Sequence, residues 1–286
     1  MTAICSSKLA PREGEKAWRQ LVLNTCAITN QLITKRKYSD AIAMFQIANQ
    51  LLESDYVKSE SVQYELLTIV KDVHAHYYSK RGKPNAAQQF IISATNAEKQ
   101  RLSMTSEDSC KLELARCYLH RACILKQLHR FNDSLRSLER VVMMMDSFIL
   151  DEHSNIKIDN VHPQILAILS VTYHNIAVIQ IVLGHIGNAC INSQTCRRIS
   201  RKCIHVTSRY LPQFEETHMK ALYEMSKLLK TPPGESKLFE NLITELFDYF
   251  SFYFVKYYPF QCLREKMYVL HFMKGRLLIL ILQIMI

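Results

Sequence analysis

The scarcity of glycine and proline limits this chain more than any other feature of its sequence. Its 286 residues include 6 glycines and 7 prolines, where average usage of about 7% and about 5% would give more than twice as many. Folds rich in β-strands, and doubly wound α/β folds, place these residues at most of their tight turns. The sequence therefore predicts a mostly helical protein with few, well-spaced breaks.

Prolines mark where the helical patterns break. Four of them fall between patterns or at helix starts: Pro11, Pro84, Pro163 and Pro212. The strongest break is Pro232-Pro233-Gly234. These breaks predict three regions: an N-terminal segment over 1–14, a helical array over 15–230 and an aromatic and hydrophobic helical tail over 231–286.

Four stretches of the array can be laid over one another as helix–turn–helix units. In each second helix a small residue comes early, a large apolar residue follows four positions later, and a small one follows three beyond that. Unit by unit, these places hold Ala41, Phe45, Ala48; Ala87, Ile91, Ala94; Ser134, Leu138, Val141; and Ala189, Ser193, Cys196. Small residues also stand where the first helix is closely approached, at Ala75, Ala122 and Ala177, with Thr29 as a weaker match. Helices that cross closely need such residues.

This pattern resembles the tetratricopeptide repeat. The equivalent residues Ala41, Ala87, Ser134 and Ala189 lie 46, 47 and 55 positions apart, whereas the family's usual period is about 34. The spacing is similar to that of the long-repeat branch typified by kinesin light chains. The resemblance implies an all-α fold, a right-handed α-solenoid of stacked helical hairpins, capped by a helix over 208–229. HEAT-like and other α-solenoids have similar periods and are the structural alternative.

The resemblance also implies a non-enzymatic scaffold whose first helices line a groove for a partner's peptide or helix. The groove positions of the family fall on polar, basic and histidine-rich residues: Asn30, Asp72, His76, Lys80, Arg116, His120, Lys126, His174 and Asn175. Such a mixture favours an acidic or phosphorylated protein segment. The family's clamp for the C-terminal carboxylate of a chaperone fits poorly, because Cys26 replaces its first lysine and Asp72 adds a negative charge.

The chain is basic, with a formal net charge of +10. One run without acidic residues holds five cations: Arg197, Arg198, Arg201, Lys202 and Arg209. On one helix they would form a stripe that could bind nucleic acid, an acidic protein or anionic lipid. The alternative is that the stripe is only a solvated outer face of the helix. A helical-repeat nucleic-acid-binding protein that uses this basic surface is the alternative function. The groove residues lack the repeated base-reading logic of RNA-binding repeats, which disfavours it.

Patterns for catalysis, cofactors and metals are missing from the sequence. There is no GxSxG, HExxH, GxxxxGK[ST] or GxGxxG motif. The nine cysteines include no CxxC pair, and Cys117, His120 and Cys123 point in different directions on a helix. We expect no catalytic residue, no cofactor and no metal site, and we interpret the cysteines as reduced, buried thiols.

The predicted tail differs from the array in composition. Eight of the twelve residues from Phe247 to Tyr258 are aromatic, and the last ten residues carry no charge. Ten residues are too few to cross a bilayer, which leaves a weak membrane contact through the tail. We expect 239–258 to cap the last repeat, and the alternative for the extreme end is a truncated gene product. Without a signal peptide, a cytoplasmic location is expected, and long-repeat relatives suggest cytoskeletal or ciliary assemblies.

Overall fold

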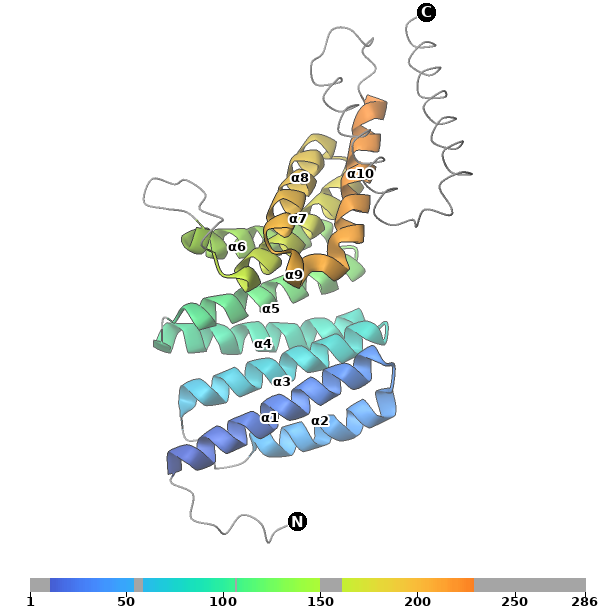
Figure 1. Ribbon diagram of the computed structural model, residues 1–286. Coiled ribbons are helices and arrows are strands. Elements are labelled where there is room, and N and C mark those ends of the chain that lie inside the picture. Colours follow the sequence, from blue (N-terminus) through green and yellow to red (C-terminus); the bar gives the residue numbers. More distant parts are fainter. Residues whose placement is uncertain (1–10, 54–58, 106, 150–160, 229–286) are drawn as a thin grey trace, which may run out of the picture.

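Helices follow one another in antiparallel pairs along the molecule (Figure 1). The computed structural model describes residues 11–53, 59–105, 107–149 and 161–228, and every regular element in these ranges is helical. The first helices of the pairs are α1 (Pro11–Thr34), α3 (Glu60–Lys80), α5 (Asp108–Gln127) and α7 (Pro163–Val182). Their partners are α2 (Tyr38–Leu52), α4 (Pro84–Thr105), α6 (Phe131–Ile149) and α8 (Ile186–Lys202). A short α9 (Ile204–Thr207) and a 3₁₀ turn, η1 (Ser208–Tyr210), lead into α10 (Leu211–Leu228), which packs on α8 and α7.

The turn inside each pair has the same backbone geometry. Four residues with positive φ end the first helices: Arg36 at 59°, Gly82 at 68°, His129 at 57° and Gly184 at 77°. At the second turn, Gly82 N donates to Ser79 O at 3.1 Å, and the next amide donates to Tyr78 O at 2.9 Å. The other three turns repeat both hydrogen bonds. This Schellman motif satisfies carbonyls that a helix end leaves without partners, so the chain reverses in the same way in every pair.

Small side chains lie where the two helices of a pair meet. The ten residues predicted for repeat packing are all buried: Ala41, Phe45, Ala48, Ala75, Ala87, Ile91, Ala94, Ala122, Ala177 and Ala189. In the third pair, Ser134 takes the place of alanine and donates its hydroxyl to the Ala122 carbonyl at 2.7 Å. Thr29 likewise donates to the Thr25 carbonyl at 2.7 Å. These hydroxyls fit at close crossings because each has a hydrogen-bond partner.

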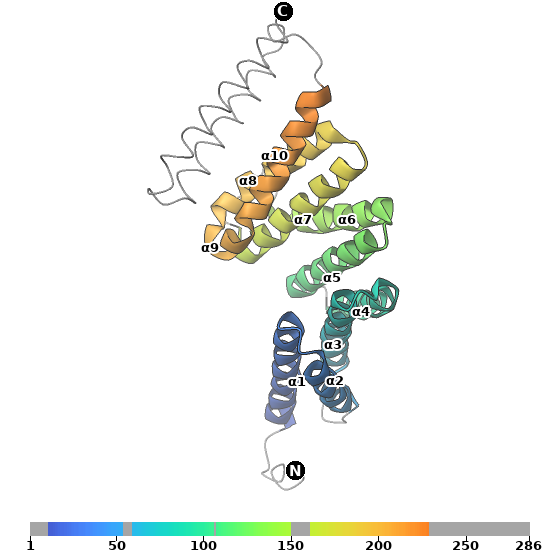
Figure 2. The same cartoon turned by 90° about the vertical axis from the view of Figure 1, so that its right-hand side faces the viewer.

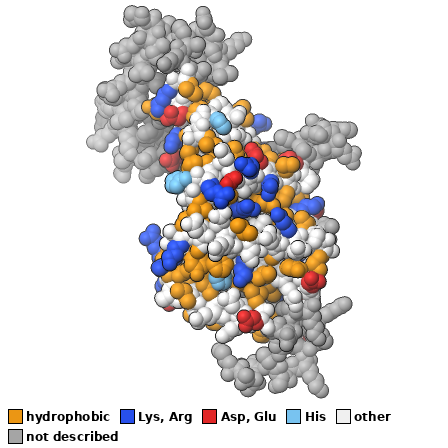
Figure 3. All heavy atoms as spheres, turned by 180° about the vertical axis from the view of Figure 1, so that it is seen from behind, with side chains coloured by type: hydrophobic (Ala, Val, Ile, Leu, Met, Phe, Trp, Pro, Cys, Tyr) orange, Lys and Arg blue, Asp and Glu red, His pale blue; other side chains and the backbone are white. Residues whose placement is uncertain are grey.

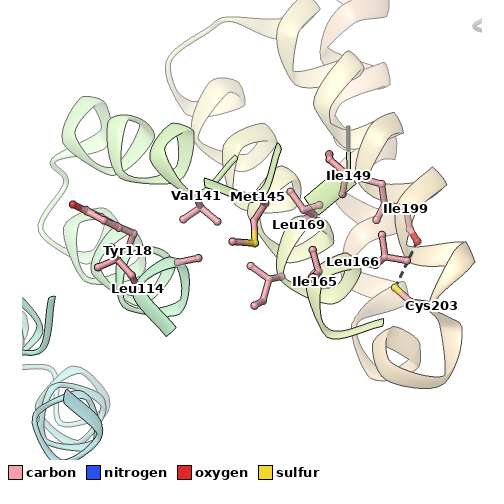
Figure 4. Packing of buried hydrophobic residues seen from close by; sticks show 12 residues of the cluster. Leu114, Tyr118, Val141, Met145, Ile149, Ile165, Leu166, Leu169, Ile199 and Cys203 are labelled. Carbon is pink, nitrogen blue, oxygen red and sulfur yellow. Dashed lines mark hydrogen bonds between the residues drawn. The ribbon is translucent and has the colours of Figure 1, made fainter. Parts of the chain in front are cut away.

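The apolar core runs along the array as a series of local clusters. One cluster joins α1, α2 and α3 around Val22, Phe45 and Val73. Another joins α5, α6, α7 and α8, where Met145 and Leu169 point toward each other (Figure 4). Each cluster is therefore built from neighbouring helices, as in other repeat proteins.

α7 is the most apolar of the described helices. By length and composition alone it could cross a membrane, but 61% of its apolar window is buried inside the structure. Ile165, Leu169 and Ile176 are among its buried residues. A helix that is covered on most sides by other helices is apolar all round, as a membrane-spanning helix is, because most of its surface is removed from water. Its composition thus fits its central position between α6, α8 and α10.

The predicted all-α solenoid of stacked hairpins is confirmed over the described residues. The paired helices run from 15 to 24 residues, which accounts for the long repeat period. In Figure 2, α3 and α5 lie on one side of the array and α4 and α6 on the other, and α1 and α9 project toward the side of α3 and α5. We call this bent side the inner face. Residues 1–10, which make up most of the predicted N-terminal segment, and the predicted tail over 231–286 lie outside the described residues.

Candidate functional site

Polar side chains of successive first helices meet along the inner face. We call the set the polar ladder. It comprises three cross-helix pairs: Asn30 of α1 with His76 of α3, Asp72 of α3 with His120 of α5, and Lys126 of α5 with Asn175 of α7. The bonded atoms lie 3.0, 2.6 and 3.1 Å apart, in that order. All six residues were predicted from the sequence as groove positions, and the structure brings them together in pairs.

The ladder follows from the repeat. Its three pairs join residues that are 46, 48 and 49 positions apart, close to one repeat length. Two further pairs have the same separation: Arg19 with Glu65, 46 apart, and Ser79 with Gln127, 48 apart. These four residues are absent from the groove residues predicted from the sequence. A search for polar residues one repeat apart on successive first helices would have found them.

His76 is neutral in this arrangement. Burial lowers its pKa, and the nearby charges of His120 and Lys80 lower it further, while Asp72 acts in the opposite direction. The His76 and His120 rings lie 6.2 Å apart, nearly perpendicular to each other. A neutral imidazole can donate through one nitrogen and accept through the other. His76 therefore bonds to Asn30 through one nitrogen, and its ring meets the His120 ring edge to face.

Most charged groups near the ladder are already paired. Arg19 pairs with Glu65, and Arg116 pairs with Glu113 of its own helix. Lys80 and Lys126 differ, since neither has a carboxylate within 4.0 Å among the described residues. Lys80 is exposed in the last turn of α3, and Lys126 lies in the last turn of α5. The positive charge of the inner face is therefore concentrated at this end of the helices.

His174 does not join the ladder, although it was predicted to lie in the groove. Its ring packs on Phe214 of α10, with centroids 5.0 Å apart. Burial, helped by the charge of Lys126, lowers the pKa of His174 to about 4. Adjacent residues of a helix point in different directions, so Asn175 meets Lys126 while His174 meets α10.

The predicted basic stripe needs a correction. Arg197 is only 9% exposed, and its Nε lies 2.7 Å from Glu215 Oε2 of α10. Arg201 Nη2 lies 3.6 Å from the other oxygen of that carboxylate. α8 ends at Lys202, so Arg209 follows on η1 and not on the same helix. The exposed cations are Arg198, Arg201, Lys202 and Arg209, and Arg197 instead fastens α10 to α8. Seen from behind, Lys and Arg side chains lie in several small groups between apolar ones (Figure 3).

The ladder offers hydrogen-bond donors and acceptors to a ligand. In the part of the chain that the structure describes, no three His, Cys, Asp or Glu residues could hold a metal ion together. Burial raises the pKa of Cys26 to about 12 and also raises that of Cys117, so both remain thiols at neutral pH. Ser193 Oγ lies 2.9 Å from His218 Nδ1, but both residues are only 1% exposed. That pair is a packing contact between α8 and α10.

A solved structure is similar to this chain at low sequence identity. No protein-family model matches the chain, and no curated protein matches it. Among solved structures, the crystal structure of BtubC (BKLC) from P. vanneervenii matches with 13% sequence identity and a TM-score of 0.44. The match covers 80% of this chain and 93% of that chain. The fold described above rests on the helices and contacts of this chain itself.

Proposed function

We propose that this chain is a non-enzymatic scaffold that binds a segment of a partner protein along its inner face. The observation that carries the proposal is the polar ladder, in which groups from α1, α3, α5 and α7 are joined at repeat intervals. Side chains that are ordered before binding lose less conformational entropy when the partner arrives. A ladder fixed by its own hydrogen bonds is ordered in this way.

The partner segment is acidic or phosphorylated. Among the described residues, Lys80 and Lys126 have no carboxylate partner, so they are the cations that attract such a segment most strongly. Arg116 contributes less, because Glu113 already pairs with it. Charge-assisted hydrogen bonds to carboxylate or phosphate are stronger than neutral ones. Work in the cytoplasm, in cytoskeletal, motor or ciliary assemblies, is proposed from the family resemblance alone.

The test is binding of the full chain to a library of acidic and phosphorylated peptides. Replacing two cations, in the variant Lys80→Glu/Lys126→Glu, should weaken binding of the selected peptides about tenfold or more, because each lost ion pair contributes up to about 1 kcal/mol. Isothermal titration with the tightest peptide gives the dissociation constants.

A control variant carries the same change in charge at two lysines outside the polar ladder. Lys37 and Lys220 are both exposed and lie outside the ladder. Lys37→Glu/Lys220→Glu should bind the selected peptides like the unmodified protein. Equal weakening in the two variants would point to net charge alone, and no weakening in either would remove the inner face as the binding surface.

A further inference from the structure

A group of cations surrounds Tyr118 on the side of the array that carries α4 and α6. We define the outer cluster by this tyrosine and four cations: Lys99 of α4, Arg121 of α5, and Arg136 and Arg140 of α6. Two positions along a helix turn a side chain by about 200°, so Tyr118 and the ladder residue His120 lie on opposite faces of α5. Figure 3 views the side of α4 and α6, and it shows a group of Lys and Arg side chains near its middle.

Two of the cations approach the same aromatic ring from different helices. The Lys99 ammonium lies 5.8 Å from the centroid of the Tyr118 ring, and the Arg140 guanidinium lies 5.6 Å from it. Arg140 Nη1 also donates to the Tyr118 hydroxyl at 3.5 Å. Tyr118 is only 5% exposed, whereas Lys99 and Arg140 are exposed. Two exposed charges are therefore held beside one buried ring.

Arg121 and Arg136 extend the cluster by one helical turn. Arg121 follows Tyr118 by three positions on α5, and Arg136 precedes Arg140 by four positions on α6. Residues with these spacings share one face of a helix. Because α5 and α6 are antiparallel, the contact between Tyr118 and Arg140 brings Arg121 to the level of Arg136.

The positive charge of the outer cluster is only partly neutralised. Asp133 lies 2.6 Å from Arg130 and 3.6 Å from Arg136. Its pKa is lowered mainly by the hydrogen bond with Arg130, and the charges of Arg130, Arg136 and Arg121 act in the same direction. Within the described ranges, three members of the cluster have no carboxylate within 4.0 Å: Lys99, Arg121 and Arg140.

Hydrogen-bond donors of the cluster also lack acceptors. Arg121 Nε is buried and has no hydrogen-bond partner among the residues that the structure describes. The Tyr118 hydroxyl accepts from Arg140, and no described group accepts the hydroxyl's own proton. Buried polar groups in native proteins are nearly always paired. Free donors beside uncancelled positive charge indicate a site for an anion with several acceptor oxygens.

We propose that the outer cluster binds the phosphate group of a phosphorylated protein segment. The Tyr118 hydroxyl donates to one phosphate oxygen, and Lys99 and Arg140 form charge-assisted hydrogen bonds with the others. A phosphorylated side chain offers three acceptor oxygens and nearly two negative charges, which suits a site with several cations. Single-stranded nucleic acid would need an aromatic face on which to stack, and the Tyr118 ring is buried. The site goes beyond the proposed function, because it lies on the other face of α5 from the ladder.

Fluorescence anisotropy with a labelled peptide tests the charged part of the site. The probe is a short peptide of glycine and serine with one central phosphoserine. The full chain should bind it, and should bind the unphosphorylated peptide far more weakly. Lys99→Gln/Arg140→Gln should weaken binding about tenfold or more, because each lost ion pair contributes up to about 1 kcal/mol. The control Lys35→Gln/Lys37→Gln removes the same charge from exposed positions of the α1–α2 turn and should bind like the unmodified protein.

Tyr118→Phe separates binding from packing. It removes the hydroxyl and keeps the ring on which Lys99 and Arg140 lie, so Tm should stay close to that of the unmodified protein. A hydrogen bond to a charged group contributes about 1.5–3 kcal/mol, so binding of the phosphopeptide should weaken about tenfold or more. The control Tyr223→Phe removes a hydroxyl from a tyrosine of α10 that is 59% exposed and should leave binding unchanged.

The variant Lys80→Glu/Lys126→Glu distinguishes this site from the inner face. The losses caused by Lys99→Gln/Arg140→Gln and by Tyr118→Phe should be the same in its background as in the unmodified protein. Phosphopeptide binding that is lost only in the inner-face variant would overturn the outer site and leave the proposed function standing. Equal binding of a peptide with a central glutamate would make the cluster a site for any acidic side chain, which contradicts the assignment to phosphate. Tighter binding of duplex RNA that is lost in the same two variants would make it a nucleic-acid site instead.

Discussion

Alanine determines how closely the paired helices can approach each other in this molecule. Ala75, Ala87 and Ala94 are completely buried, and they pack in one cluster with Ile91 and Ile124. A larger side chain at such a crossing would have to push two helix backbones apart, because protein interiors contain few voids. The small residues therefore fix the helix separation as well as fill space.

Replacing Ala87 with leucine should destabilise the fold. Ala87→Leu inserts three carbon atoms into a site with no exposed surface, and overpacking of this kind costs about 1–3 kcal/mol. The midpoint of urea unfolding should fall accordingly. Ala43→Leu is the control, because Ala43 lies on the exposed face of α2 and should tolerate leucine. Equal midpoints for the two variants would contradict the close crossing.

His218 should make stability depend on pH. It is 1% exposed, and burial, assisted by Arg197 and Arg201, lowers its pKa to about 3. In the unfolded chain a histidine has a pKa near 6.5, so the unfolded chain takes up the proton first as the pH falls. This contribution to stability is complete above about pH 6.5 and is lost as the pH falls toward 3. Between pH 7 and pH 5 the loss is about 2 kcal/mol. His218→Gln should show a correspondingly smaller loss in urea unfolding at these two pH values, and identical losses would contradict this account.

The repeat pattern predicts contacts within a helix pair better than contacts between the repeats and α10, which lies outside the pattern. Ala41, Ala87 and Ala189 occupy equivalent positions in their pairs, and all three are buried. Because the position recurs along the chain, one sequence is enough to predict it. Arg197 was placed on an exposed stripe because its partner, Glu215, lies on a different helix with no repeat relation to it. His174 was expected in the groove and packs on Phe214 instead, which also belongs to α10.

The four pair turns use one geometry but two kinds of residue. Gly82 and Gly184 adopt positive φ without strain, whereas Arg36 and His129 adopt it as side-chain-bearing residues. A residue with a Cβ in this region costs about 1–2 kcal/mol relative to glycine. Gly82 and Gly184 are typical residues for positive φ, whereas the positive φ of Arg36 and His129 is not evident from the sequence. It follows from the two hydrogen bonds that close each turn.

Exchanging these residues should change stability in opposite directions. Arg36→Gly and His129→Gly should each raise the free energy of unfolding by up to about 1 kcal/mol, after the greater flexibility of glycine in the unfolded chain is deducted. Gly82→Ala and Gly184→Ala should each lower it by about 1 kcal/mol. Nothing lies within 4 Å of a Cβ added at either glycine, so the cost comes from the backbone alone. Urea midpoints measure all four variants, and a stabilising Gly82→Ala would contradict the assignment.

Helix starts were easier to predict than the α8–α10 connection. Pro11, Pro84 and Pro163 each begin a helix, as expected for a residue that lacks an N–H where none is needed. The α9 turn carries no such signal. The buried Thr207 hydroxyl holds it in place, and a contact of that kind depends on the packing of α8.

Over the described residues, the hydrophobic core of the array is divided into several clusters. Each helix packs mainly on the helices next to it, so the free energy of folding is distributed over local clusters and the interfaces between them. The polar ladder adds a link from one pair to the next along the inner face. A change at one end should therefore be felt strongly in its own pair and progressively less in more distant pairs.

Two core truncations at opposite ends test this distribution. Phe45 stacks on His74 at 4.0 Å in the cluster of α1, α2 and α3, and Leu169 is completely buried in the cluster of α5 to α8. Phe45→Ala should cost about 3–5 kcal/mol and Leu169→Ala about 2–5 kcal/mol. Amide hydrogen exchange should then quicken mostly in α1–α3 for the first variant and mostly in α6–α8 for the second. Because contacts are made between neighbours, protection at the far end should stay close to that of the unmodified protein. Uniformly faster exchange throughout the molecule in both variants would show instead that the array unfolds as one cooperative unit.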